Sequence, residues 1–163
     1  MQCPGCGAAM RLDDDKDFFT CEYCGNVFFP EPNGDGVRVL GEPAAEACPV
    51  CAVPLVHAAL AGHRLLQCTR CRGMLVEVGV FMPLMEELRA RCGSPTGIPH
   101  RPAPGELDRH IRCPRCHDEM DTHLYGGPGN VVIDNCERCE LNWLDYGELR
   151  WITQAAEGQY VTE

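Results

Sequence analysis

The chain has 163 residues, with 24 acidic and 14 basic side chains and a formal net charge of −10. This charge argues against a general affinity for phosphate backbones. No apolar run is long enough to span a bilayer, and the N-terminus has neither the charged nor the apolar region of a secretory signal. We therefore expect a cytoplasmic protein, in a reducing compartment where thiols stay available to metal ions.

Twelve of the thirteen cysteines form three sets, and each set consists of two Cys-x-x-Cys pairs. The spacer between the two pairs is fourteen, sixteen and nineteen residues long in the three sets. Each pair presents two thiolates to one point, and a hairpin that brings the second pair over completes the tetrahedron that Zn²⁺ favours. The predicted ligands of three structural zinc ions are Cys3, Cys6, Cys21 and Cys24 in the first set, Cys48, Cys51, Cys68 and Cys71 in the second, and Cys113, Cys116, Cys136 and Cys139 in the third.

Other uses of these cysteines fit less well. Iron can occupy the same tetrahedral site, although spacers this short are typical of structural zinc. Disulfides are disfavoured because matched Cys-x-x-Cys pairs are typical of metal sites. Cys92 lies outside the three sets, and we expect a buried thiol on a helix. The histidines near the pairs are expected on the surface or in packing, not as ligands; they are His57, His63, His117 and His123.

The blocks around these sets are too small to form independent apolar cores, so metal binding would supply most of their folding free energy, on the order of 10 kcal/mol per site. We predict a small, metal-stabilised, mostly β protein of three zinc ribbons, of which the second and third are each followed by a short helix. The predicted divisions are an N-terminal ribbon at 1–29, a linker at 30–47, a second ribbon with its helix at 48–92, a Pro/Gly-rich linker at 93–109, and a third ribbon with its helix at 110–163.

In the first block, 18–20 and 27–29 contain aromatic and β-branched residues and predict short antiparallel strands. Gly7 and Gly25 each follow the second cysteine of a pair, and glycine allows the left-handed backbone that closes a knuckle turn. The acidic run 13–17 predicts a solvated hairpin tip. In the first linker, the apolar stretch 37–40 is a candidate strand for the edge of a ribbon.

The second and third blocks repeat one another. Each continues from its last cysteine with a strand, an acidic residue, a glycine and a helical segment. In the second block the helix is predicted at 83–92, with Pro83 in its first turn and Gly93 ending it. In the third, Asp145 and Glu148 have the spacing of a capping box. The aligned positions are Leu75 and Trp143, Val76 and Leu144, Glu77 and Asp145, Gly79 and Gly147, and Phe81 and Leu149.

The third block carries a family resemblance. Its two cysteine pairs are followed by Trp143-Leu144-Asp145 and then by Gly147-Glu148-Leu149, and this pattern resembles the transcription factor IIB-type zinc ribbon family. The second block resembles a degenerate copy that lacks the tryptophan, and the first resembles only a generic zinc ribbon. The resemblance implies a zinc-binding ribbon fold. It does not imply a role in transcription, since fold does not fix function.

Each set supplies four cysteines, whereas catalytic zinc keeps an open coordination position, so we predict structural sites and no enzymatic activity.

Trp143, Tyr146 and Trp151 either cover the core under the last helix or form a surface that docks a protein partner. We predict an adaptor or a small subunit of a larger assembly. The alternative is a transcription or nucleic-acid accessory protein, supported by the basic side chains of the middle block, which are Arg64, Arg70, Arg72, Arg89 and Arg91.

The charge is unevenly distributed, with net values of −6, +2 and −6 in residues 1–47, 48–100 and 101–163. Opposite charge favours docking of the first two ribbons, and the two acidic ends repel. The linker 93–109 has four prolines and no periodic apolar pattern, which predicts an extended spacer with few contacts. We therefore expect an N-terminal pair of ribbons tethered to a separate third ribbon.

Overall fold

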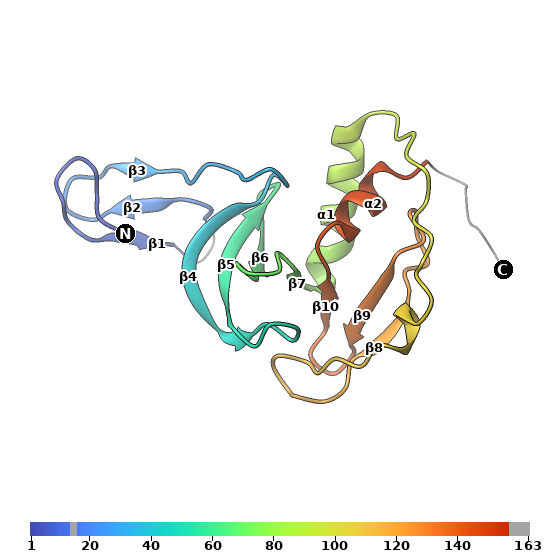
Figure 1. Cartoon of the computed structure of the whole chain (residues 1–163). Helices are drawn as coiled ribbons and strands as arrows, with labels where there is room; N and C mark the ends of the chain where they lie inside the picture. Colours follow the sequence, from blue (N-terminus) through green and yellow to red (C-terminus); the bar gives the residue numbers. More distant parts are fainter. Residues whose placement is uncertain (14–15, 157–163) are drawn as a thin grey trace.

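A computed structural model describes residues 1–13 and 16–156 of the chain. Within these residues the strands form two antiparallel sheets, and the helices follow the second and third groups of strands, as predicted (Figure 1). No helix in this part of the chain is long and apolar enough to cross a membrane. The small sheet has the order β1 (Met10–Leu12), β2 (Phe19–Cys21), β3 (Val27–Phe28). The large sheet has the order β4 (Arg38–Ala47), β5 (Pro54–Leu60), β6 (His63–Gln67), β7 (Met74–Glu77), β10 (Leu141–Leu144), β9 (Val132–Cys136), β8 (Asp121–Leu124).

The small sheet is the first ribbon, and it docks on the second as predicted. Met10 and Phe19 are buried in one cluster with Leu40 of β4 and Ala59 of β5. Arg38 adds a hydrogen bond to the carbonyl oxygen of Pro30 at 2.7 Å. The strands at 18–20 and 27–29 are confirmed by β2 and β3. The predicted hairpin tip 13–17 includes residues 14 and 15, which lie outside the described residues.

More than half of the predicted linker 30–47 forms a strand, β4. The predicted pairing of 37–40 with a ribbon edge is confirmed, because Arg38 and Val39 pair with Ala59 and Ala58 of β5. The strand then continues to Ala47, with shifts in register on either side of Pro43. Proline has no N–H to donate, and β4 tolerates it because it is the edge strand of the sheet.

The third ribbon is not separate, which corrects the expected arrangement. β7 and β10 are the corresponding strands of the two repeats, and they pair antiparallel. Leu75 lies opposite Trp143, its own aligned position, so a pseudo-twofold axis passes between them. The order β5-β6-β7-β10-β9-β8 obeys the same symmetry. Alone, each repeat would leave β7 or β10 as an open edge, and the pairing covers both edges at once.

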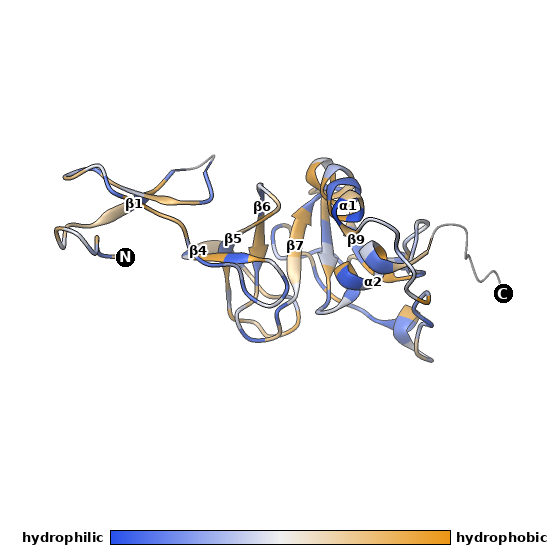
Figure 2. Ribbon diagram, turned by 90° about the horizontal axis from the view of Figure 1, so that it is seen from above, coloured by the Kyte–Doolittle hydropathy of each residue, from blue (hydrophilic) through white to orange (hydrophobic). Residues whose placement is uncertain are grey.

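The two faces of this sheet have different partners. On one face Met74, Val76 and Leu144 pack in a cluster with the apolar side of the helices. On the other face Leu75 and Trp143 pack in a cluster that contains the second and third cysteine sets. Figure 2 shows the apolar colouring on β6 and β7 and the mixed colouring of α1. Because neighbouring side chains on a strand point to opposite faces, two four-residue strands serve both cores.

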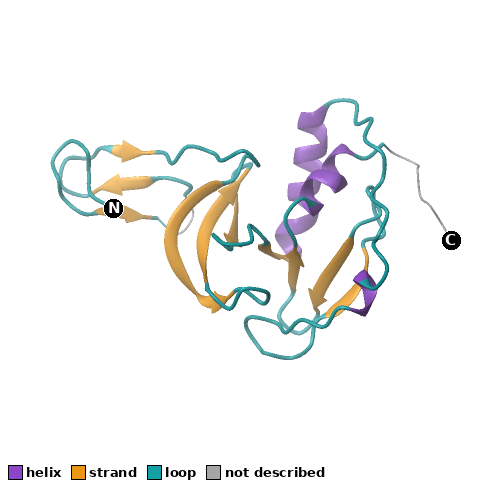
Figure 3. Cartoon of the chain, in the orientation of Figure 1, coloured by secondary structure: helices purple, strands orange, loops and turns teal. Residues whose placement is uncertain are grey.

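The helices α1 (Val78–Cys92) and α2 (Glu148–Gln154) lie beside each other on the sheet (Figure 3). The predicted start of α1 at Pro83 is wrong, whereas its end before Gly93, at a φ of 73°, is confirmed. The β7–β10 ladder extends to Val78, whose N–H donates to the carbonyl oxygen of Glu140 at 2.9 Å, and the helix begins there directly. Cys92 ends the helix and is exposed, so the expectation of a buried thiol is also wrong.

The segment 93–109 is a strap against the third ribbon rather than a free spacer. Gly97 exchanges backbone hydrogen bonds with the end of α2, donating to Gln154 at 2.7 Å and accepting from Ala156 at 3.1 Å. The His100 ring stacks on the Trp151 ring with centroids 3.8 Å apart. A short 3₁₀ turn, η1 (Glu106–Asp108), precedes the third cysteine set. Proline content alone predicted an extended backbone, but extended backbone can still make contacts.

Two glycines of the second repeat test the packing at the pseudo-twofold axis. A Cβ on Gly73 would overlap the Trp143 ring, whereas a Cβ on Gly79 would meet no described atom within 4 Å. We expect Gly73→Ala to lower the free energy of unfolding by about 1–3 kcal/mol through overpacking. Gly79→Ala, on the exposed side of α1, should be neutral or stabilise by up to about 1 kcal/mol. Chemical denaturation of both variants measures this, and equal losses would contradict the packing described.

Candidate metal centres

The six Cys-x-x-Cys turns share one backbone conformation. In each, the residue that follows the second cysteine has a positive φ, between 53° and 76°. In five of them this residue also donates its N–H to the carbonyl oxygen of the first cysteine at 2.8–2.9 Å. Glycine was predicted for this role in the first ribbon and is confirmed there, but the other ribbons use residues with side chains. The six positions are Gly7, Gly25, Ala52, Arg72, His117 and Glu140.

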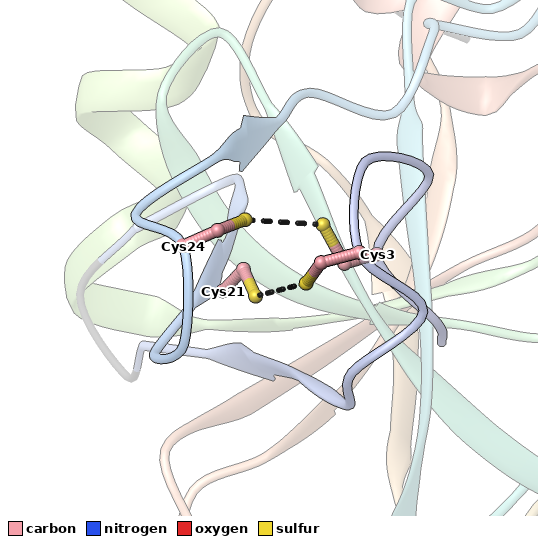
Figure 4. Close-up of side chains that lie close together, drawn as sticks. Cys3, Cys21 and Cys24 are labelled. Atoms are coloured by element: carbon pink, nitrogen blue, oxygen red, sulfur yellow. Dashed lines mark hydrogen bonds between the residues drawn. The ribbon is translucent and has the colours of Figure 1, made fainter.

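These turns bring the four sulfurs of each predicted set together. In the described part of the chain the cysteines form three groups whose Sγ atoms all lie within 4.8 Å of one another. The Sγ–Sγ distances include 3.6 Å for Cys3–Cys24 and Cys6–Cys21, 3.7 Å for Cys48–Cys71, and 3.6 Å for Cys116–Cys136. A tetrahedron with metal–sulfur bonds of about 2.3 Å has edges of about 3.8 Å, so the geometry fits zinc. The first group is drawn in Figure 4.

None of the described cysteines forms a disulfide, and the acidities of the thiols within the first group differ strongly. The N–H of Gly5 stabilises the Cys3 thiolate and lowers its pKa to about 6. Although the N–H of Ala8 favours ionisation of Cys6, desolvation and the neighbouring thiols raise the pKa of Cys6 to about 12. Four adjacent thiolates repel one another, and a divalent cation would offset this repulsion by displacing the remaining protons.

The second and third groups belong to one apolar cluster. Cys48 and Cys68 are buried in it with Cys113 and Cys136 of the other repeat. Leu75 and the indole of Trp143 complete the same cluster. In the first group, by contrast, Cys6 and Cys24 are exposed. The two groups that flank the pseudo-twofold axis are therefore linked through shared packing, and the first group stands apart.

Trp143 is a core residue, which corrects its assignment to a partner-binding surface. Its side chain is 0% exposed because it lies at the pseudo-twofold axis, over Gly73. The indole Nε1 donates to Asp145 Oδ1 at 3.0 Å, so the buried donor has a partner. Tyr146 and Trp151 are 54% and 38% exposed, and they remain candidates for a docking surface.

The comparisons with known proteins agree with this geometry. A family model described as transcription factor zinc-finger, of the TFIIB zinc-ribbon type, matches residues 47–87 and 112–155. The chain belongs to this TFIIB-type zinc ribbon family. The two matched segments cover just over half of the chain and coincide with the two pseudosymmetric repeats, while the first four-cysteine group lies outside them. No curated protein and no solved structure matches the chain.

Outside the cysteines, the TFIIB-type ribbon of the third block holds a partly buried ionic group that the sequence did not reveal. Asp145 accepts two hydrogen bonds from Arg109, at the end of the strap. Arg109 also lies 3.7 Å from a carboxylate oxygen of Asp134, which is 3% exposed. Thr122 Oγ1 donates to Asp134 Oδ1 at 2.5 Å. The Arg109 guanidinium thus joins the strap to β9 and to the residue that follows β10, and Thr122 of β8 joins the same group through Asp134.

The predicted capping box forms only in part. Glu148 Oε2 accepts the backbone N–H of Asp145 at 2.6 Å, as a capping box requires. The Asp145 side chain does not return a bond to the helix, because it is engaged by Trp143 and Arg109, and Gly147 is the N-cap of α2. Glu148 is 5% exposed, and burial raises its pKa to about 8.

Metal content and ligand removal test the three centres. We expect native mass spectrometry to find three zinc ions per chain, and two after Cys136→Ser. Cys136→Ser should also lower Tm strongly, because the binding energy of each site contributes to folding. Cys92→Ser is the matched control, since Cys92 is exposed and outside the groups, and should keep three ions and the original Tm. Bound iron, or equal losses in both variants, would contradict the assignment.

Glu148 predicts a pH dependence of stability. Its pKa is raised from an ordinary value of 4.5 to about 8, so the folded state holds a proton that the unfolded state releases between these values. The contribution of Glu148 therefore falls as pH rises from 5 to 8, by up to about 1.4 kcal/mol per pH unit. Glu148→Gln can still accept the Asp145 N–H and has no charge to bury. We expect its stability relative to the original protein to rise over this range; a constant difference would be contrary to the prediction.

Proposed function

We propose that this chain is a non-enzymatic, cytoplasmic adaptor or small subunit that carries three structural zinc ions and binds a protein partner. Each four-cysteine group supplies a full tetrahedral ligand set, which supports a structural rather than a catalytic metal. Thiols that must stay free for metal support a reducing compartment.

The observation that carries the proposal is an open groove beside the two exposed aromatic side chains. Tyr146 and Trp151 line a pocket of about 570 Å³, together with residues from the end of α1 and from the segment before β4. Aromatic side chains are enriched where proteins bind one another, and a few of them usually dominate the binding energy. A groove walled by two such residues, over a rigid sheet, favours a docking role.

The nucleic-acid alternative loses most of its support from the same region. Of the five arginines in the middle block, Arg72 pairs with Asp35, and Arg91 pairs with Glu87 at 2.6 Å. Arg89 donates to the carbonyl oxygens of Ile152 in α2 and of Ala155 just after it, and Arg64 donates to a carbonyl oxygen in the first ribbon. Arg64, Arg72 and Arg89 thus join distant segments of the fold, and the total charge of −10 opposes a polyanion.

Partner binding can be tested with matched aromatic variants. Affinity purification from cells should recover a protein whose amount falls at least severalfold with Tyr146→Ala and with Trp151→Ala. Tyr23→Ala removes an aromatic side chain that is 85% exposed on the first ribbon, and it should leave recovery unchanged. Zinc content and Tm of each variant control for folding. Titration with the purified partner should rank the affinities of the variants in the same order. Equal recovery of the partner by all three variants would contradict the proposal.

A further inference from the structure

The groove has a basic rim in an acidic protein. Its lining includes the guanidinium groups of Arg72, Arg91 and Arg150 and one carboxylate, that of Asp35. The lining therefore carries a formal charge of +2, in a chain whose total is −10. Arg91 pairs with Glu87 at 2.6 Å and Arg150 donates its Nε to Gln154 Oε1 at 3.2 Å. Both side chains are exposed, and each guanidinium has further N–H donors that can reach a ligand. A basic rim of this kind attracts a carboxylate and steers its approach.

The floor and walls of the groove are apolar. Met74 of β7 and Leu149 of α2 are buried beneath it, and Leu88 of α1 is partly buried at its side. Trp151 forms part of the wall, and its ring is held in place by the stack with His100. A rigid aromatic wall over an apolar floor suits a large apolar side chain, because little side-chain entropy is lost on binding.

One buried donor in the groove lacks a partner. Gln67, at the end of β6, lines the groove and is 3% exposed, and its Nε2 has no hydrogen-bond partner among the described residues. Such a donor destabilises the free protein while it stays unpaired. An acceptor oxygen from a ligand would remove that cost, and an apolar ligand would not.

We infer that this groove binds an acidic peptide segment of the partner, in which a carboxylate side chain lies next to a large apolar one. The inference rests on the proposed function and names the chemistry of the partner. The carboxylate pairs with the guanidinium groups of Arg91 and Arg150, which offer donors in a geometry that matches it. The apolar side chain lies on Trp151, and a carboxylate or carbonyl oxygen of the segment accepts from Gln67.

The test uses the full-length, zinc-loaded protein and a blocked hexapeptide of sequence Asp-Glu-Phe-Asp-Leu-Glu. The matched control peptide replaces each acidic residue with its amide. The chain has two tryptophans, and Trp143 is buried away from the groove, so a change in tryptophan fluorescence reports on Trp151. We expect saturable binding of the acidic peptide, at least tenfold tighter than that of the amide peptide.

Variants of the rim and floor test whether the peptide binds in the groove or binds any positively charged part of the surface. Arg91→Gln with Arg150→Gln should weaken binding about tenfold. Arg138→Gln, which removes an exposed guanidinium on the third ribbon, should leave it unchanged. Gln67→Leu should weaken binding while leaving the free protein at least as stable, because it removes the unpaired donor. If Gln67 had a purely structural role, the substitution would not weaken peptide binding while keeping the stability of the free protein.

Several results would overturn the inference. They are equal affinity for the two peptides, equal effects of the rim variants and Arg138→Gln, or displacement of the acidic peptide by inorganic phosphate or by an RNA oligonucleotide at lower concentration. The adaptor proposal is tested separately. If a partner is captured through Tyr146 and Trp151 but the acidic peptide does not bind, the ligand chemistry is wrong and the adaptor role stands. If the amount of captured partner is unchanged by both Tyr146→Ala and Trp151→Ala, the adaptor role fails.

Discussion

The rest of the structure depends on the pairing of β7 with β10. Each ribbon is a hairpin and one further strand, and that last strand would be an open edge without a partner. The two repeats use each other as that partner, with Leu75 opposite Trp143 at the axis. One face of the joined strands then closes the apolar cluster around two four-cysteine groups, and the other face supports both helices. A single backbone pairing thus gives two small ribbons a core that neither could form alone.

The groove proposed for the partner is a product of the same pairing. Met74 and Leu88 come from the second repeat, Tyr146 and Trp151 come from the third, and Asp35 comes from the segment that precedes β4. The strap fixes the geometry further, because His100 orients the Trp151 ring and Arg109 anchors Asp145. Zinc would therefore act at a distance from the groove, by holding the ends of the strands that position it.

Local patterns in the sequence predicted local features well. The cysteine spacing identified all three groups, and the glycine at 93 identified the end of α1. Contacts between segments that are distant in the sequence could not be predicted from such local patterns. For Trp143 the sequence left a core position and a docking surface both open, because nothing near it in sequence shows that β7 lies across from it. The segment 93–109 was taken for a spacer because its contacts are backbone hydrogen bonds, one ring stack and the ion pairs of Arg109, which leave no periodic apolar pattern.

The central claim is that the second and third ribbons form one cooperative unit. Hydrogen exchange of the Cys51→Ser variant, followed by mass spectrometry, tests it most directly, because this change damages only a ligand of the second group. Our account predicts a loss of protection in β5 to β7 and equally in β10 and β9, since the shared cluster and the β7–β10 ladder are both weakened. Loss of protection confined to residues 48–92, with β9 and β10 unchanged, would contradict the account.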